Sequence, residues 1–347
     1  MFFISFVQTG TFVLVGNTIL EVGNMNMAYF LVLFSTACFA NMLGLNISAS
    51  FRNAVTIYIL IPFLIIPQLL LSGVIVEFDK LNPGFSSDEY VPITGEVMAS
   101  KWAYEALATE QFKSNNYEKH FFESDQKISE NGFKISYLIP KLESKLNNIF
   151  AHVERGTQSQ ALENEIALCK TELELLEKTP GATPFYRLRN LTSSRYDSTS
   201  HHQTLNQLQI LKKKYSKLKA DALTERDVIY NDLVKEMGKA GLVELKRRNH
   251  NSNLAYLVTN REQLVKVHET NGRLIQKKDP IFLTPSSNFG NAHFYAPVKM
   301  LGGIEINTFL FNILVIWFMT ASLYMTLYYD TLRKTLRFIS NLFVKYY

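Results

Sequence analysis

The segment that decides the fold runs from Asn53 to Val76 and reads NAVTIYILIPFLIIPQLLLSGVIV. It has no charged side chain. Hydrocarbon has no water to bond backbone amides, so about 20 mostly apolar residues are stable in a bilayer only as a helix. The segment is therefore predicted to span a membrane. A short amphipathic stretch, Val97 to Phe112, follows it and is predicted to be a second, interfacial helix.

Three other segments of spanning length also have no Asp, Glu, Lys or Arg: residues 1–20, 22–51 and 306–329. Each is predicted to be one transmembrane helix. The sequence thus predicts an all-α membrane protein with four transmembrane helices. Three of them lie in residues 1–76, and the last lies in residues 304–347 together with a basic tail.

Residues 77–303 have a different composition. They hold 31 of the 36 Lys and Arg residues and 28 of the 31 Asp and Glu residues, a net charge of +3. A mixed-sign surface of this kind suits a solvated domain, and without a recognition motif it gives no reason to expect nucleic acid. We expect an outer linker and the amphipathic helix in residues 77–112, and an extracytoplasmic insertion in residues 113–303.

The short connections between spans indicate the orientation. The link around Glu21–Asn26 has no Lys or Arg, whereas the next turn contains Arg52. The tail adds Arg333, Lys334, Arg337 and Lys345. Basic residues are enriched in cytoplasmic connections, so both termini are predicted to be cytoplasmic and the large insertion to lie outside. The insertion has no disulfide pattern, which favours a bacterial inner membrane over a eukaryotic cell surface.

Two stretches of the insertion have apolar residues at heptad spacing. The first runs from Leu142 to Leu176 with a polar interruption at Gly156–Gln160, and the second runs from Leu205 to Ile229, before Gly238. They predict an antiparallel coiled-coil hairpin over about residues 141–238, with intermolecular pairing as the alternative. The loop that joins them is expected to carry a solvated His201–His202 pair. Residues 242–303 allow no fold prediction beyond a candidate strand at 254–258.

The chain has none of the motifs that mark a catalytic or metal site. It lacks the Gly-Lys-Ser/Thr loop that holds nucleotide phosphates, a nucleophile elbow, and His or Cys pairs at metal spacing. We therefore expect no catalytic residue, no metal site and no enzyme activity on this chain.

Two polar residues in apolar surroundings are candidate functional residues. Glu105 lies in the amphipathic stretch, where a carboxylate is costly unless it is hydrated or paired. It could also face water or pair with Lys101 one turn earlier. Asn41, inside the second span, must avoid lipid. It could line a translocation path or hold helices together.

Several features taken together resemble the membrane domain of ABC transporters of the G subfamily, which is a type-2 ABC exporter permease. The tight turn at Arg52 is one of them. Another is Leu71-Ser72-Gly73-Val74-Ile75, which closes the third helix, and a third is Trp102-Ala103-Tyr104-Glu105-Ala106-Leu107. The resemblance covers residues 1–112 and 300–347 and corresponds to the carboxyl-terminal four of the family's six helices.

The resemblance implies positions for several residues. Part of the third helix would line a substrate cavity, the residues after Ser72-Gly73 would form an apolar valve that closes it outward, and the amphipathic helix would be re-entrant. The implied residues are Ile66 and Leu69 for the cavity, joined by the candidate Asn41; Val74 and Ile75 for the valve; and Trp102, Tyr104 and Glu105 for the re-entrant helix.

The resemblance also implies partners. A second permease half would complete a homo- or heterodimer, and an ATP-binding cassette domain, fused upstream or separate, would bind ATP and Mg and supply the ATPase activity. The expected function is the permease portion of an ATP-driven exporter that moves an unidentified amphipathic or lipid-like substrate by alternating access. The alternative is a non-transporting membrane scaffold or sensor that presents its coiled coil to an extracytoplasmic protein.

Overall fold

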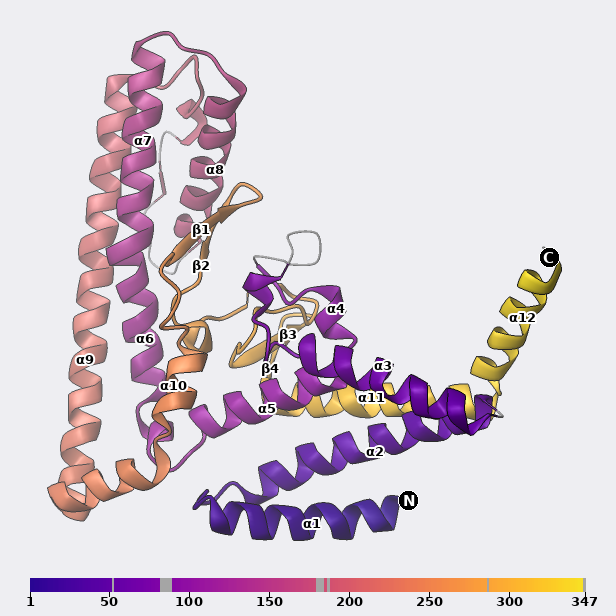
Figure 1. The fold of residues 1–347 in the computed structure, drawn as a ribbon. Coiled ribbons are helices and arrows are strands. Elements are labelled where there is room, and N and C mark those ends of the chain that lie inside the picture. Colours follow the sequence, from indigo (N-terminus) through magenta and orange to yellow (C-terminus); the bar gives the residue numbers. More distant parts are fainter. Residues whose placement is uncertain (52, 82–88, 179–183, 186–187, 286, 346–347) are drawn as a thin grey trace. The chain divides into compact units, whose positions relative to one another are not determined.

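The computed structural model describes the chain except for residues 52, 82–88, 179–183, 186–187, 286 and 346–347. The chain is mostly helical and divides into two compact units (Figure 1). Unit 1 comprises Met1–Lys119, Val243–Val258 and Thr284–Tyr347, and unit 2 comprises His120–Leu242 and Thr259–Leu283.

Among the described residues, three helices of unit 1 are long and apolar enough to cross a membrane: α1 (Phe2–Ile19), α2 (Asn26–Ser50) and α11 (Thr308–Tyr328). The fourth predicted span forms the apolar helix α3 (Ala54–Leu70), which has 17 residues. At 1.5 Å per residue it is about 25 Å long, somewhat less than a hydrocarbon core of about 30 Å. The all-α membrane fold is confirmed, with three helices of spanning length and a shorter one where four full spans were predicted.

Local chemistry explains where α3 begins and ends. The Asn53 side chain accepts a hydrogen bond from the Val55 amide at 3.0 Å, which caps the helix start. The helix ends before Gly73, whose φ is +79°. A Cβ atom there would lie 2.5 Å from the Phe78 ring and 2.9 Å from Phe294, so only glycine fits. Val74 and Ile75 therefore follow the helix instead of belonging to it.

Hydrogen bonds fix the directions of the three long helices. Asn41 donates to the Ser5 hydroxyl at 2.6 Å, and Asn17 donates to Asn26 at 2.7 Å across the turn between α1 and α2, so these helices are antiparallel. Asn46 donates to the Leu323 carbonyl at 2.9 Å, which brings the carboxyl ends of α2 and α11 together. The turn after α2 and the tail after α11 hence lie at the same end of the helix layer, although Arg52 itself lies outside the described residues.

The remaining elements of unit 1 are short. They are η1 (Phe78–Lys80), α4 (Ile93–Glu96), α5 (Ala99–Lys113), η2 (Glu118–His120, whose last residue belongs to unit 2), α10 (Ser252–Val258), β3 (Val298–Leu301), β4 (Ile304–Asn307) and α12 (Thr331–Lys345). Strands β3 and β4 form an antiparallel hairpin in which Val298 faces Asn307. The candidate strand at 254–258 is helical instead, because the Asn251 side chain caps the Leu254 amide at 3.0 Å.

Unit 2 is a helical bundle with a small β-hairpin. Its elements are α6 (Phe122–Phe133), the π-helical turn η3 (Lys134–Leu138), α7 (Ile139–Glu154), α8 (Gln160–Glu177), η4 (Leu188–Asn190), α9 (Ser198–Asn249), β1 (Val267–Thr270), β2 (Arg273–Gln276) and η5 (Pro280–Phe282). The insertion is helical as predicted, but the first heptad stretch forms two helices, α7 and α8. The chain turns at Gly156, which has φ +66°, and Ser159 caps α8. Helix α9 has a kink at Gly238, which follows the second heptad stretch and has φ +75°.

The prediction of a solvated histidine pair is wrong for His201. Helix α9 already begins at Ser198, and His201 is 4% exposed. Its ring stacks on Phe150 with centroids 4.3 Å apart, and its Nδ1 lies 3.0 Å from the Tyr196 hydroxyl. The early start of α9 and the rings of Phe150 and Tyr196 bury this side chain. The composition of the segment, which is typical of a loop, predicted neither.

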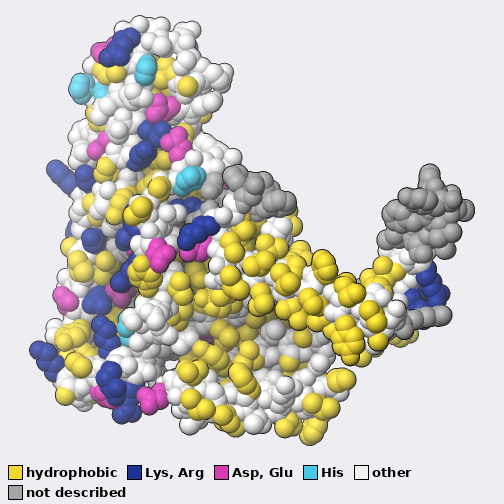
Figure 2. All heavy atoms as spheres, viewed as in Figure 1, with side chains coloured by type: hydrophobic (Ala, Val, Ile, Leu, Met, Phe, Trp, Pro, Cys, Tyr) yellow, Lys and Arg dark blue, Asp and Glu magenta, His cyan; other side chains and the backbone are white. Residues whose placement is uncertain are grey.

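The surface differs between the two units. Figure 2 shows hydrophobic side chains crowded over the apolar helices, while Lys, Arg, Asp and Glu are interspersed over unit 2. Unit 1 thus presents the surface of a lipid-embedded domain, and unit 2 that of a water-exposed one.

Candidate functional site

Four residues predicted from the resemblance lie on one short stretch of chain. Ile66 and Leu69 are on the last turns of α3, and Val74 and Ile75 follow its end. All four are between 48% and 62% exposed. The Ser72 hydroxyl donates to the Leu69 carbonyl at 2.8 Å and accepts from the Val74 amide at 3.3 Å, so this stretch leaves the helix in a fixed direction. These four apolar side chains therefore form an uncovered surface in the single chain.

Asn41, the other cavity candidate, has a different position. Its amide donates to Ser5 on α1, and its side chain is half-buried between α1 and α2. This hydrogen bond joins α2 to α1, and a role of Asn41 in a translocation path stays a prediction. Its bond to α1 does not bring it to the surface formed by Ile66 and Leu69.

Helix α5 is bound to the end of α3, just before Val74 and Ile75, the residues predicted to form the valve. The Ser100 amide donates to Gln68 Oε1 at 3.2 Å, and the Ser100 hydroxyl donates to the Gln68 carbonyl. The predicted amphipathic helix at 97–112 is found as α5 at Ala99–Lys113. Trp102 is buried and donates from Nε1 to the Glu96 carbonyl at 2.7 Å, which fixes the start of α5 against α4.

Glu105 is fully buried at the centre of a charged cluster. Its carboxylate lies 2.8 Å from Lys299 Nζ on β3 and 3.2 Å from Lys101 Nζ one turn earlier. Asn312 on α11 donates to its second oxygen at 2.9 Å. The pairing with Lys101 is thus present, but Glu105 does not face water. The cluster joins α5, α11 and β3.

The charges of this cluster are balanced. Burial by itself raises the pKa of the Glu105 carboxyl, but Lys101, Lys299 and the hydrogen bonds from Lys299 and Asn312 outweigh it and lower the pKa to about 2. Glu96 lies 3.2 Å from Lys101, so two carboxylates face two ammonium groups. Lys101 also lies 3.5 Å from the centre of the Trp102 ring, a cation–π contact. Glu105 is therefore ionised at neutral pH.

Aromatic side chains connect α5 to the segment that follows α3, which contains Gly73, Val74 and Ile75. The Tyr104 ring lies 6.2 Å from Phe294 and 6.2 Å from Tyr295, and Phe294 packs edge-on against Phe78 at 5.1 Å. Phe78 and Phe294 are the rings that leave no room for a side chain at Gly73. Trp102, Tyr104 and Glu105, predicted to belong to a re-entrant helix, thus make three different contacts: with α4, with the aromatic cluster and with the charged cluster.

Lys299 and Asn312 were not found from the sequence. Lys299 gave no signal, because it lies 194 residues from Glu105 in an unassigned stretch. Asn312 did give one, since a polar side chain inside an apolar span needs a protein partner. Its Oδ1 is buried without a hydrogen-bond partner, which marks the least satisfied point of the cluster.

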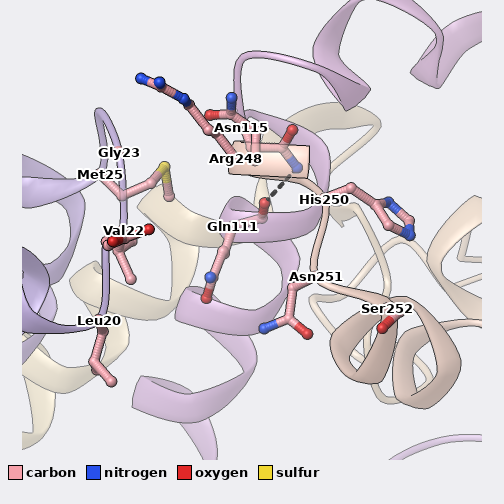
Figure 3. Close-up of a pocket in the computed structure, with 12 residues that line it drawn as sticks. Leu20, Val22, Gly23, Met25, Gln111, Asn115, Arg248, His250, Asn251 and Ser252 are labelled. Carbon is pink, nitrogen blue, oxygen red and sulfur yellow. Dashed lines mark hydrogen bonds between the residues drawn. The ribbon is translucent and has the colours of Figure 1, made fainter. Parts of the chain in front are cut away.

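A separate pocket of about 290 Å³ lies at the turn between α1 and α2. It is lined by that turn, by the last turns of α5 and by the junction of α9 and α10 (Figure 3). Figure 3 shows Gln111 and Asn251 on the side facing Val22, whereas His250 points away. His250 is held there by Glu118, 2.6 Å from its Nδ1. None of Ile66, Leu69 and Asn41 lines this pocket, so it is not the predicted substrate cavity.

The apolar helices define an integral membrane protein that is mostly α-helical. Residues 1–94 match the family model of the ABC-2 type transporter, so this part of the chain is an ABC-2 type transporter membrane domain. This part of the chain contains α1, α2, α3 and the predicted valve residues Val74 and Ile75, and it gives the protein the general role of a transporter permease. Such a permease works together with an ATP-binding domain. Searches of curated proteins and of solved structures found no match to the chain.

Proposed function

We propose that this chain is the permease portion of an ATP-driven exporter of the G-subfamily type, which moves an amphipathic or lipid-like substrate outward by alternating access. One observation carries the proposal. Helix α3 has no buried residue along its whole length, although α1, α2 and α11 each have a buried face. Its apolar surface, within the residues that match the transporter family, is therefore free to face a second subunit and a substrate.

A second permease half gives that surface its function. In a two-fold dimer, Ile66 and Leu69 from each copy would line a shared cavity. Val74 and Ile75 from each copy would close it toward the outside. Branched apolar side chains that meet across an axis exclude water until the helices that carry them separate. One copy alone encloses no path.

The contacts of α5 suggest how the valve moves. Ser100 ties α5 to the end of α3, and Glu105 ties it to Lys299 and Asn312. Opposite charges in a poorly solvated site are costly to separate. We therefore expect the end of α3, α5 and the start of α11 to shift as one body when the two halves move apart.

The partners and location follow from the same proposal. An ATP-binding cassette domain, on the same or another polypeptide, would bind ATP and Mg and drive the cycle, while this chain contributes no catalytic residue. The shared end of α2 and α11 supports a common side for the Arg52 turn and the basic tail. With basic residues inside, that side is the cytoplasm of a bacterial cell, and unit 2 is extracytoplasmic.

The test is a double substitution, Val74→Ala and Ile75→Ala, in the complete transporter reconstituted in liposomes. A valve with shorter side chains should leak, so we expect increased passive flux of an amphipathic dye and raised basal ATPase activity. The matched control is Val55→Ala with Ile59→Ala, which removes equally exposed apolar side chains from the other end of α3. Unchanged flux and ATPase in the valve variant would contradict the assignment.

The scaffold or sensor remains the alternative function, and one observation favours it. Unit 2 has a hydrophobic core of its own, as a separate binding domain would. Affinity purification from native membranes distinguishes the exporter from the scaffold. An exporter should retain an ATP-binding cassette domain whether or not residues 141–238 are present. A scaffold should retain none and should lose its extracytoplasmic partner when those residues are deleted.

A further inference from the structure

The last helix, α12, has a composition unlike that of the apolar helices. It spans Thr331–Lys345 and reads TLRKTLRFISNLFVK, with four basic residues and no acidic one. It begins directly after α11, from which only Tyr329 and Asp330 separate it. Asp330 has φ +51°, so the chain turns there. Its backbone carbonyl accepts a hydrogen bond from the Lys334 amide at 3.0 Å, the first bond of the new helix.

The order of residues in α12 produces two faces. In the sequence, Leu332 and Leu336 are separated by a step of four. In a helix this spacing forms one apolar face. The same geometry places Arg333, Lys334 and Arg337 away from it. Leu332, at the start of this face, is exposed.

Exposed tyrosines at the end of α11 indicate where α12 lies relative to the membrane. Tyr324, Tyr328 and Tyr329 are exposed there, with ring centroids 6.4 Å apart for the first pair and 5.1 Å for the second. Tyrosines gather where a spanning helix leaves the hydrocarbon. Figure 2 shows Lys and Arg side chains gathered where α12 starts. The helix therefore starts at the boundary between lipid and water.

We propose that α12 lies in the plane of the membrane surface and binds anionic phospholipid headgroups through Arg333, Lys334 and Arg337. Its apolar face would enter the acyl boundary, and its basic face would meet the phosphates. Charge complementarity and direct continuity with a spanning helix favour lipid over an acidic protein surface. Each basic residue near an anionic surface strengthens binding roughly fivefold, so the three together contribute on the order of 100-fold.

The experiment uses the full chain in nanodiscs, without an ATP-binding partner. Hydrogen exchange of α12 amides is compared between discs of phosphatidylcholine alone and discs with phosphatidylglycerol, at low and high salt. We expect at least tenfold greater protection with the anionic lipid, lost at 1 M salt because bound ions screen the headgroups. The triple variant Arg333→Gln, Lys334→Gln, Arg337→Gln should lose this dependence while α11 amides stay protected.

The matched control removes three lysines from unit 2 by Lys212→Gln, Lys213→Gln and Lys217→Gln. It changes the net charge equally and should keep the lipid dependence of α12. Equal protection in both kinds of disc would overturn the proposal. So would protection that arises only after the ATP-binding domain is added, because α12 would then be a protein docking helix. The measurement uses no transport assay, so its outcome is independent of the proposed export activity.

Discussion

Two apolar helices of unit 1, α1 and α11, bury mostly polar side chains, whereas α7 of unit 2 buries apolar ones. In α11 of unit 1, the buried residues recur every fourth position and are mostly polar: Thr308, Asn312, Ile316 and Thr320. In α7 of unit 2, all the buried residues are apolar: Ile139, Leu142, Leu146 and Ile149. Helix α1 repeats the first pattern with Ser5, Thr9, Val13 and Asn17. In α8 the buried residues are apolar except Glu172, which pairs with Arg273 at 2.8 Å.

The difference shows how the solvent selects the interior. In water, burying apolar surface drives packing, so unit 2 is apolar inside and charged outside. In lipid the surroundings are as apolar as leucine, so helices associate through close packing and hydrogen bonds between polar groups. The charged cluster around Glu105 extends this principle, because the Glu105 carboxylate is paired with buried groups of the protein and not with water.

Among tests of this contrast between the two interiors, Lys299→Met should have the largest effect on stability. It leaves the buried Glu105 carboxylate with one ammonium partner fewer. We expect a loss of about 3–5 kcal/mol in the free energy of unfolding, since an underpaired buried charge is strongly destabilising. Thermal unfolding of the purified chain in detergent measures it, with faster hydrogen exchange in α5 and α11 as the local readout. Lys80→Met, at a surface pair with Glu77, is the control and should change stability by less than about 1 kcal/mol.

A second variant sharpens this result. Glu105→Gln combined with Lys299→Met removes one charge of each sign and leaves Lys101 with Glu96. It should recover part of the lost stability, because no buried carboxylate then lacks a partner. If the single and double variants are equally destabilised, packing and not charge pairing explains the effect.

Leu146→Ala tests the apolar core of unit 2. Leu146 is fully buried in the core of unit 2, so the cavity and lost apolar burial should cost about 2–5 kcal/mol. Hydrogen exchange should increase in α7, α8 and α9 but not in α11. Leu223→Ala, at an exposed position of α9, is the matched control and should cost less than about 0.5 kcal/mol. Comparable losses at both positions would refute the assignment of this core.

Asn46→Ala tests hydrogen bonding between membrane helices. Asn46 donates to the Leu323 carbonyl and accepts from Thr326 at 2.9 Å, so its removal unties α2 from α11. The expected cost is only about 0.5–2 kcal/mol, because helices in lipid find alternative partners when unfolded. Ser322→Ala is the control, since this exposed hydroxyl bonds a carbonyl of its own helix. A cost as large as that of Leu146→Ala would erase the contrast between the two units.

The smallest expected effect is a pH dependence confined to unit 2. Burial, followed by His202, lowers the pKa of His201 below its ordinary value near about 6.5. The unfolded chain therefore binds the proton more readily. Stability is full above pH of about 6.5 and falls below it, by at most about 1.4 kcal/mol per pH unit. His201→Gln should flatten this dependence in α7 and α9 exchange. The exposed His202→Gln should keep most of it, because burial is the larger cause of the lowered His201 pKa.

Hydropathy predicted the apolar helices because spanning a bilayer depends on local composition. Their ends were less predictable. The charge-free run to Val76 contains the helix end at Leu70, and Gly73 just after it lies against the rings of Phe78 and the distant Phe294. In unit 2 the heptad residues were mostly the buried ones, but the reversal at Gly156 depended on how α7 and α8 pack.

The candidate site was predictable only in part. Glu105 attracted attention because a carboxylate near lipid is costly. Its partner Lys299 could not be inferred, since 194 intervening residues give no spacing rule. Asn41 met the same polarity criterion as Asn46 and Asn312, and only their hydrogen bonds show which helices each one joins.

The sequence by itself determined that this is an integral membrane protein. It also determined which segments are apolar and which segment is water-exposed and helical. These properties depend on the transfer of neighbouring side chains between water and lipid, and composition over about 20 residues is enough to decide them. Only the tertiary structure decided that Glu105, Lys299 and Asn312 meet, and that α3 stays uncovered. Those outcomes depend on contacts between distant segments, which no local pattern encodes.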